Sequence, residues 1–176
     1  RMLPHFGVKL RVSPDSISVD GEQKLTGCEV HVPGDPSSAA FWMAAAALVP
    51  GADVEIRNVS LNPTRIGFMR VLERMGARVE YDVTESMPEP RGNVRVRQAA
   101  LRGTSVEPGE IPSLIDELPV LAILATQAEG ETVVHGAREL RVKESDRIEA
   151  VARNLRAMGG VIETFEDGYA VRGIQK

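Results

Sequence analysis

The sequence has 176 residues, a net charge of −4 and one cysteine, Cys28; 43% of its residues are hydrophobic and 26% are charged. This length allows one domain with a buried core or two small lobes. The acidic balance argues against a nucleic-acid-binding protein, which usually has a basic excess. No apolar run reaches the ~18 residues of a transmembrane helix. A lone cysteine cannot form an intrachain disulfide, so we expect a reducing, cytoplasmic compartment.

The first 30 residues differ in character from the rest. The stretch "VKLRVSPDSISVDGEQKLTG" alternates and turns often, which predicts short strands at the end of a preceding lobe, residues 1–30. The chain begins at Arg1 and not at methionine. We therefore expect a piece of a longer protein.

Residues 31–99 predict a regular succession of elements. The strand "EVHVP" ends at Pro33, and Asp35 and Pro36 are suited to cap and begin a helix over 36–49. Its "AAFWMAAAALV" is apolar on nearly all sides, which is typical of a buried helix. The elements expected next are a strand over 52–59, a helix over 64–75, and "ARVEYDV" pairing with "NVRVRQ" across the loop at 84–92.

Residues 100–176 repeat this order. We expect a helix over 117–128, a strand over 131–137, a helix over 145–158, and strands over 160–165 and 168–173. Gly51 and Gly130 lie 79 residues apart, whereas Met75 and Met158 lie 83 apart. The second copy (100–176) therefore has a longer loop before its second helix than the first copy (31–99), and added loops often carry function.

Each copy is predicted to be one β-α-β-α-β-β unit of a mixed α/β fold. Because the long helices are apolar on nearly all sides, we expect them to face inward, with the sheets outward. Several such units closing around a shared helical core would give this arrangement.

The segment "IPSLIDELPVLAIL" places Asp116 at or just before a helix, because Pro119 is best tolerated in a first turn. Two interpretations remain open for Asp116. It caps the helix, or it is a carboxylate positioned as a general base. The neighbouring Glu117 is expected to be solvated or to cap the helix.

The segment "LRVKESDRIEA" places charged residues before an amphipathic helix that starts near Glu144 or Ser145. Lys143 and Arg147 are four residues apart and can share one side of its first turn. Cations there oppose the positive end of the helix dipole, unless a bound anion offsets the cost. A solvated helix start is the alternative to an anion site.

Two neighbours of this segment receive structural interpretations. Arg141 is expected to face water. Asp146 is expected to pair with Arg147 or to cap the helix.

The long run "IDELPVLAILATQAEGETVVHGARELRVKESDRIEAVARNLRAMGG" resembles the C-terminal lobe of the EPSP synthase (3-phosphoshikimate 1-carboxyvinyltransferase) family. The upstream "PGDPSSAAFWMAAAAL" and "NPTR" fit the same family, so the resemblance covers essentially the whole chain. It implies two lobes, each of three β-α-β-α-β-β units with inward helices. This chain would hold the end of the upper lobe and two units of the lower one.

The resemblance implies transfer of an enolpyruvyl group from phosphoenolpyruvate to the 5-hydroxyl of shikimate 3-phosphate, without metal or organic cofactor. By motif, Asp116 would be the base on the hydroxyl, and Glu144 would manage the proton at C3 of phosphoenolpyruvate. Lys143 would bind shikimate 3-phosphate and help set the proton transfers. Arg147 would hold an anionic group of phosphoenolpyruvate, for which a guanidinium fork is suited.

Other motifs of the family's site are not in this chain, so we expect no turnover from it alone. We expect the parent protein to be a monomer, and apolar helix faces left without a third unit to favour self-association of this chain. Two alternatives remain: a UDP-N-acetylglucosamine enolpyruvyl transferase, and a non-catalytic repeat module that binds partners through its sheets.

Overall fold

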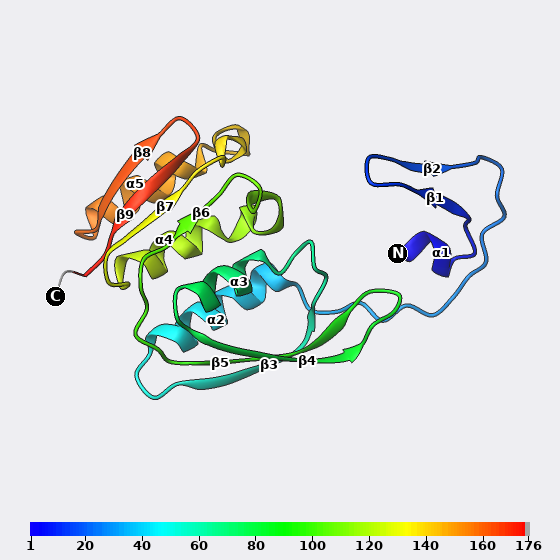
Figure 1. The fold of residues 1–176 in the computed structure, drawn as a ribbon, viewed down its shortest axis with the longest axis horizontal. Coiled ribbons are helices and arrows are strands. Elements are labelled where there is room, and N and C mark those ends of the chain that lie inside the picture. The colour runs from blue at the N-terminus through cyan, green and yellow to red at the C-terminus, as the bar shows by residue number, and fades with distance from the viewer. Residues whose placement is uncertain (175–176) are drawn as a thin grey trace.

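The computed structural model describes residues 1–174 and contains a mixture of helices and strands (Figure 1). The helices are α1 Met2–His5, α2 Pro36–Leu48, α3 Gly67–Arg74, α4 Leu118–Thr126 and α5 Arg147–Ala157. The strands are β1 Leu10–Val12, β2 Ile17–Val19, β3 Asp53–Ser60, β4 Arg78–Glu85, β5 Arg91–Arg97, β6 Ser105–Val106, β7 Glu131–Val134, β8 Val161–Phe165 and β9 Gly168–Arg172. Three 3₁₀ turns are η1 Ile111–Ser113, η2 Ile115–Glu117 and η3 Arg138–Val142.

The first copy builds an antiparallel sheet in the order β3-β5-β4. Its hairpin pairs Arg78 with Arg97, which confirms the expected pairing of the two alternating segments. The prediction of a strand that ends at Pro33 is wrong. Residues 28–33 form no strand, and only Gly34 reaches the sheet, through an isolated bridge to Val59. An alternating segment forms a strand only where an adjacent strand supplies backbone hydrogen-bond partners. Among residues 28–34, such a partner, Val59, is available only to Gly34.

The second copy builds a four-stranded sheet in the order β6-β7-β9-β8. β6 runs parallel to β7, and the other pairs are antiparallel. The hairpin expected at Asp167-Gly168 is confirmed by the pairing of Phe165 with Gly168. This copy therefore has the expected β-α-β-α-β-β order, whereas the first copy lacks its opening strand.

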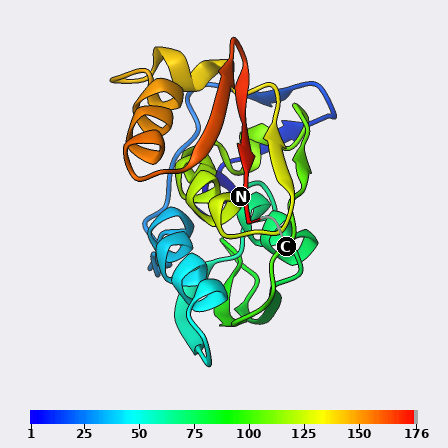
Figure 2. The same cartoon turned by 90° about the vertical axis from the view of Figure 1, so that its left-hand side faces the viewer.

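Helices α2, α3 and α4 lie between the two sheets (Figure 1; Figure 2 gives the view turned by 90°). α2 packs on β3 and β5, α4 packs on β7 and β9, and α2 and α4 contact each other. One hydrophobic cluster spans both copies and includes the fully buried Met43, Leu72, Val94, Leu121, Leu140 and Val171. Inward helices are thus seen between these two copies.

Helix α2 is buried on one side only, so the expectation that it is covered all round is wrong for this chain. Phe41 and Trp42 are 64% and 66% exposed, while Ala40 and Met43 beside them are buried. The sheet and α4 contact one side of the helix, and no described residue covers the side that carries the two aromatic residues.

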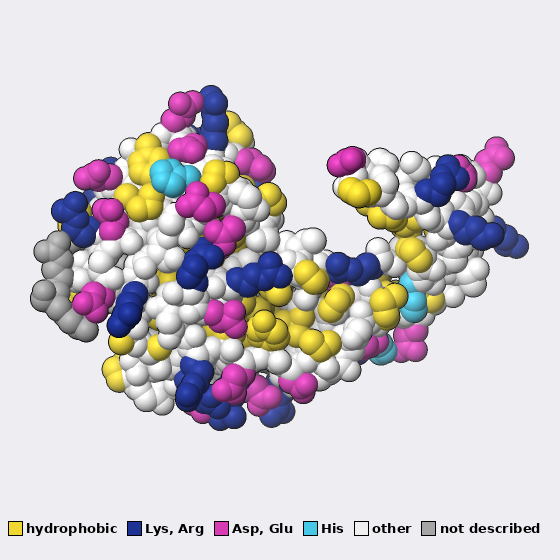
Figure 3. All heavy atoms as spheres, in the orientation of Figure 1, with side chains coloured by type: hydrophobic (Ala, Val, Ile, Leu, Met, Phe, Trp, Pro, Cys, Tyr) yellow, Lys and Arg dark blue, Asp and Glu magenta, His cyan; other side chains and the backbone are white. Residues whose placement is uncertain are grey.

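The N-terminal part forms the small β1-β2 hairpin with α1 and projects from the two copies, with Arg1 Nη1 3.6 Å from Glu89 Oε1 of the first copy. A hollow separates it from the body of the molecule, and hydrophobic side chains gather along its floor (Figure 3). No helix within residues 1–174 is long and apolar enough to cross a membrane.

The two copies touch closely where α3 begins. A Cβ added to Gly67 would lie 2.1 Å from Ser113 Oγ and 2.9 Å from the Ser113 carbonyl oxygen. Real Cβ contacts are not this short. Gly67 therefore lets the start of α3 approach the segment that leads into α4.

Candidate functional site

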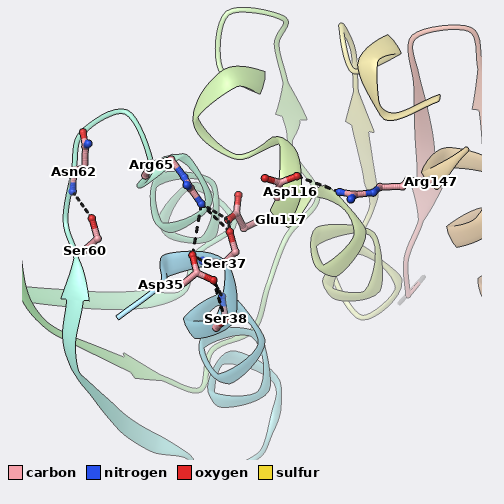
Figure 4. Close-up of polar contacts among 9 residues, drawn as sticks. All are labelled: Asp35, Ser37, Ser38, Ser60, Asn62, Arg65, Asp116, Glu117 and Arg147. Carbon is pink, nitrogen blue, oxygen red and sulfur yellow. Dashed lines mark hydrogen bonds and ion pairs between the residues drawn. The ribbon is translucent and has the colours of Figure 1, made fainter. Parts of the chain in front are cut away.

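Three helices, α2, α4 and α5, begin near one another, and polar side chains join their starts (Figure 4). Ser37 of α2 contacts Glu117, which directly precedes α4, and Arg147 of α5 contacts Asp116. Helix N-termini carry partial positive charge and unpaired N–H groups. The helix starts therefore favour the carboxylates that lie at this end of the fold.

Asp116 lies in η2, immediately before α4, as the sequence predicted. Its side chain makes no capping hydrogen bond to the helix. It accepts a hydrogen bond from Arg147 Nη1 at 3.1 Å instead, and its side chain is 47% exposed. Of the two interpretations, the cap is excluded, and an accessible carboxylate beside a guanidinium remains.

Arg147 joins two carboxylates from different parts of the second copy. Its Nη2 donates to Glu144 Oε2 at 2.8 Å, while Nη1 donates to Asp116. These bonds, that to Glu144 foremost, raise the pKa of Arg147. The backbone N–H of Glu144 and then Arg147 lower the pKa of Glu144. Arg147 is thus a cation, and Glu144 an ionised carboxylate, at neutral pH.

Lys143 lies outside α5, contrary to the expectation that it shares the first helical turn with Arg147. α5 begins at Arg147, with Asp146 as its N-cap accepting from Glu149 N at 3.0 Å. Lys143 follows η3 in an extended conformation, and its Nζ lies 3.2 Å from Glu139 Oε1. The helix starts later than predicted because the capping side chain, and not the first charged residue, sets its start.

Arg141 does not face water, which corrects the sequence-based expectation. Its guanidinium donates to the backbone oxygens of Phe165 and Glu166, and to Asp146 Oδ2 at 2.8 Å. Its side chain is only 22% exposed. It therefore ties the long loop of the second copy to the turn of the β8-β9 hairpin.

Glu117 is buried, so the expectation of a solvated or capping side chain is wrong. Only 3% of the residue is exposed, and its carboxylate accepts a short hydrogen bond from the Ser37 hydroxyl. Arg65 donates to Ser37 Oγ at 2.9 Å and lies 3.9 Å from Glu117 Oε1. Burial raises the pKa of Glu117, and the opposing effects of Ser37 and Arg65 are smaller.

Arg65 was not singled out from the sequence, although a signal for it exists. In both copies an Arg-Ile pair, Arg65-Ile66 and Arg147-Ile148, stands at the start of the second helix. Matching these pairs would have placed Arg65 beside the same helix start as Arg147. Within residues 1–174, no group of three or more His, Cys, Asp or Glu side chains is arranged to hold a metal ion.

Comparison with known proteins gives consistent matches over the whole chain. The sequence model of the family described as EPSP synthase (3-phosphoshikimate 1-carboxyvinyltransferase) matches residues 1–176. The 3-phosphoshikimate 1-carboxyvinyltransferase of Bacillus licheniformis is 50% identical, over 98% of this chain and 41% of that protein. The one from Persephonella marina is 45% identical, over 100% of this chain and 42% of that protein.

Solved structures agree with the sequence matches. An EPSP synthase from Acinetobacter baumannii superposes with a TM-score of 0.93 at 41% identity, over 99% of this chain and 40% of that one. The chain thus has a mixed α/β fold that matches part of that structure. It spans less than half the length of the relatives it matches.

Proposed function

The chain belongs to the EPSP synthase family, and we propose on this basis that the full-length protein containing it transfers the enolpyruvyl group of phosphoenolpyruvate to the 5-hydroxyl of shikimate 3-phosphate. The products are 5-enolpyruvylshikimate 3-phosphate and phosphate. The observation that carries the proposal within the site is Arg147, which holds the carboxylates of both Asp116 and Glu144. One cation is thereby shared by the two groups proposed to move protons.

Asp116 is the proposed base. Removing the hydroxyl proton lets the oxygen form a bond to C2 of phosphoenolpyruvate, while C3 gains a proton from Glu144. The tetrahedral intermediate then breaks its C2–O bond to phosphate, and C3 returns a proton to the Glu144 carboxylate. The departing phosphate takes up the proton held by Asp116, so each proton has a donor and an acceptor and both carboxylates return to their starting states.

Arg147 is proposed to bind an anionic group of phosphoenolpyruvate. Its N–H groups already bind two carboxylates, so a substrate carboxylate or phosphate would compete for them. Losing the contact with Arg147 would raise the pKa of Glu144, because that contact is one cause of its lowered value. Substrate binding would thereby prepare Glu144 to carry the proton that C3 needs.

Lys143 is proposed to bind shikimate 3-phosphate and to help set the proton transfers. Its ammonium lies beside the exposed Glu139, and its own side chain is 26% exposed. An exposed pair of this kind contributes little stability, so a phosphate can displace Glu139 at small cost. No metal or organic cofactor enters this scheme.

The architecture is also a proposal beyond the mixed α/β fold. We assign residues 1–30 to the end of one lobe, and 31–99 and 100–176 to two units of a lobe whose helices all face inward. Residues outside this chain would cover Phe41 and Trp42 in the parent protein, a cytoplasmic monomer. The isolated chain should then self-associate, which light scattering at increasing concentration would reveal.

The test is phosphate release by the full-length protein. Release that requires both phosphoenolpyruvate and shikimate 3-phosphate supports the proposal. Release with UDP-N-acetylglucosamine in place of shikimate 3-phosphate would refute it in favour of the related transferase. The purified 176-residue chain should show no turnover in the same assay.

A further inference from the structure

Glu117 is the only buried acidic residue among residues 1–174. Burying a carboxylate is unfavourable unless hydrogen bonds and a nearby cation offset the cost. Ser37 and Arg65 supply both. An apolar side chain would fill this buried position without the cost of burying a carboxylate, so packing alone does not explain why a glutamate stands here.

The contacts of Glu117 join separate elements of the two copies. Ser37 is the second residue of α2, and Arg65 lies just before α3, both in the first copy. Arg65 also lies 3.7 Å from Asp35 Oδ1, the N-cap of α2. Three motifs without an assigned role, "PGDPSS", "NPTR" and the Glu of "IDELP", therefore meet at one point.

This point is one residue from Asp116. The two carboxylates point in different directions, Asp116 toward Arg147 and Glu117 toward Ser37 and Arg65 (Figure 4). Neither caps α4, although Glu117 occupies its N-cap position. Consecutive Cα atoms are ~3.8 Å apart, so a fixed Glu117 side chain limits where the backbone of Asp116 can lie.

We infer that Ser37, Glu117 and Arg65 form a positioning cluster that holds Asp116 in place from the first copy. The inference rests on the proposed function, because it assigns the cluster to the proposed base. Asp116 itself remains exposed and free to contact substrate. The first copy thereby contributes to a site whose proposed catalytic groups all lie in the second.

Adjacent serines provide a matched test in the full-length protein. Ser37 donates to Glu117, whereas Ser38 donates only to Asp35. Ser37→Ala should lower kcat by about 10- to 100-fold, the scale expected for a misplaced reacting group, with KM for phosphoenolpyruvate within about twofold of wild type. Ser38→Ala should leave kcat unchanged, and Ser37→Thr, which keeps a hydroxyl, should restore most of it.

Amide hydrogen exchange gives a readout that does not depend on turnover. Ser37→Ala should speed exchange in the segment 114–118 by about tenfold, since local opening becomes easier, and Ser38→Ala should not. Equal kcat values in the two alanine variants, or equal exchange in that segment, would overturn the positioning role. If wild type lacks turnover with both substrates, the proposed function fails, and the exchange comparison alone judges the cluster.

Discussion

The two copies use corresponding arginines in different ways. Arg65 and Arg147 each precede an isoleucine at the start of the second helix of their copy. Both point at the dipeptide before α4: Arg147 bonds the exposed Asp116, whereas Arg65 reaches the buried Glu117 through Ser37. The Arg-Ile pair thus places an arginine against an exposed carboxylate in one copy and near a buried carboxylate in the other.

The loop before each arginine explains the difference. In the first copy it is short and is held by Asn62, whose Oδ1 accepts from the backbone N–H and the hydroxyl of Thr64. In the second copy it is longer and brings Glu144 next to Arg147. The longer loop of the second copy thus supplies a second carboxylate to its arginine, within the same kind of fold.

The largest expected effect contrasts the two neighbouring carboxylates. Asp116→Asn in the full-length protein should lower kcat by about 10²- to 10⁴-fold, the usual contribution of a positioned acid or base. Glu117→Gln keeps an acceptor for Ser37 and should cost less than about tenfold, because small displacements cost less than a lost base. Steady-state rates, with circular dichroism to verify folding, measure both. Similar losses in the two variants would break the comparison.

The second largest effect is expected on KM for phosphoenolpyruvate, and it should distinguish Arg147 from Arg65. Arg147→Lys replaces a fork by a point charge, so KM for phosphoenolpyruvate should rise about 10- to 100-fold, the equivalent of about 1.5–3 kcal/mol for a charged hydrogen bond. Arg65→Lys should leave that KM unchanged. Initial rates at varied phosphoenolpyruvate concentration decide this, and a matching rise in the Arg65 variant would show that both arginines contact substrate.

Substituting Arg141 tests how much its contacts with the β8-β9 turn contribute to stability. Arg141→Ala removes the hydrogen bonds from Arg141 to two backbone oxygens and to Asp146 Oδ2, so the free energy of unfolding should fall by about 1–3 kcal/mol. Arg138→Ala removes only a pair whose side chains are 74% and 75% exposed, and should change it by less than about 1 kcal/mol. Urea titration measures both values, and equal changes would mean that these contacts have no special role.

The smallest effect is a difference in the sign of pH dependence. The folded-state pKa of Glu117 is raised above its ordinary 4.5, so its contribution to stability is present below that value and is lost as pH rises through the raised pKa. Glu117→Gln should therefore gain stability relative to wild type with rising pH. The pKa of Glu144 is lowered, so its contribution is lost as pH falls, and Glu144→Gln should show the opposite trend. Urea titrations across pH 3 to 8, about the range over which these groups ionise, would reveal identical slopes if the two environments were alike.

Local signals in the sequence predicted most elements. Asp35 and Pro36 set the start of α2, and Asp167-Gly168 set the β8-β9 hairpin, because a cap or a tight turn depends on residues next to it. Asp116 and the segment around Arg147 were likewise identified as a candidate site. The contact between Asp116 and Arg147 spans 31 residues, yet both motifs were already marked by their chemistry.

The errors fall where distant residues decide the outcome. The buried Glu117 carboxylate has a hydrogen-bond donor in Ser37, which is 80 residues away in the sequence. Arg141 is drawn from water by backbone oxygens of a hairpin turn 24 and 25 residues later. Residues 28–33 form no strand because no neighbouring strand pairs with them. The alternating pattern of a segment does not tell whether such a neighbour exists.

The close contact between Gly67 and Ser113 couples substitutions at these two positions. A methyl group at this position would meet Ser113, three residues before Asp116, so a change in the first copy would displace the start of α4 in the second. Replacing Ser113 by glycine removes the 2.1 Å contact with its hydroxyl but leaves the 2.9 Å contacts with its backbone. Glycine at position 113 can therefore restore only part of the stability that an alanine at Gly67 removes.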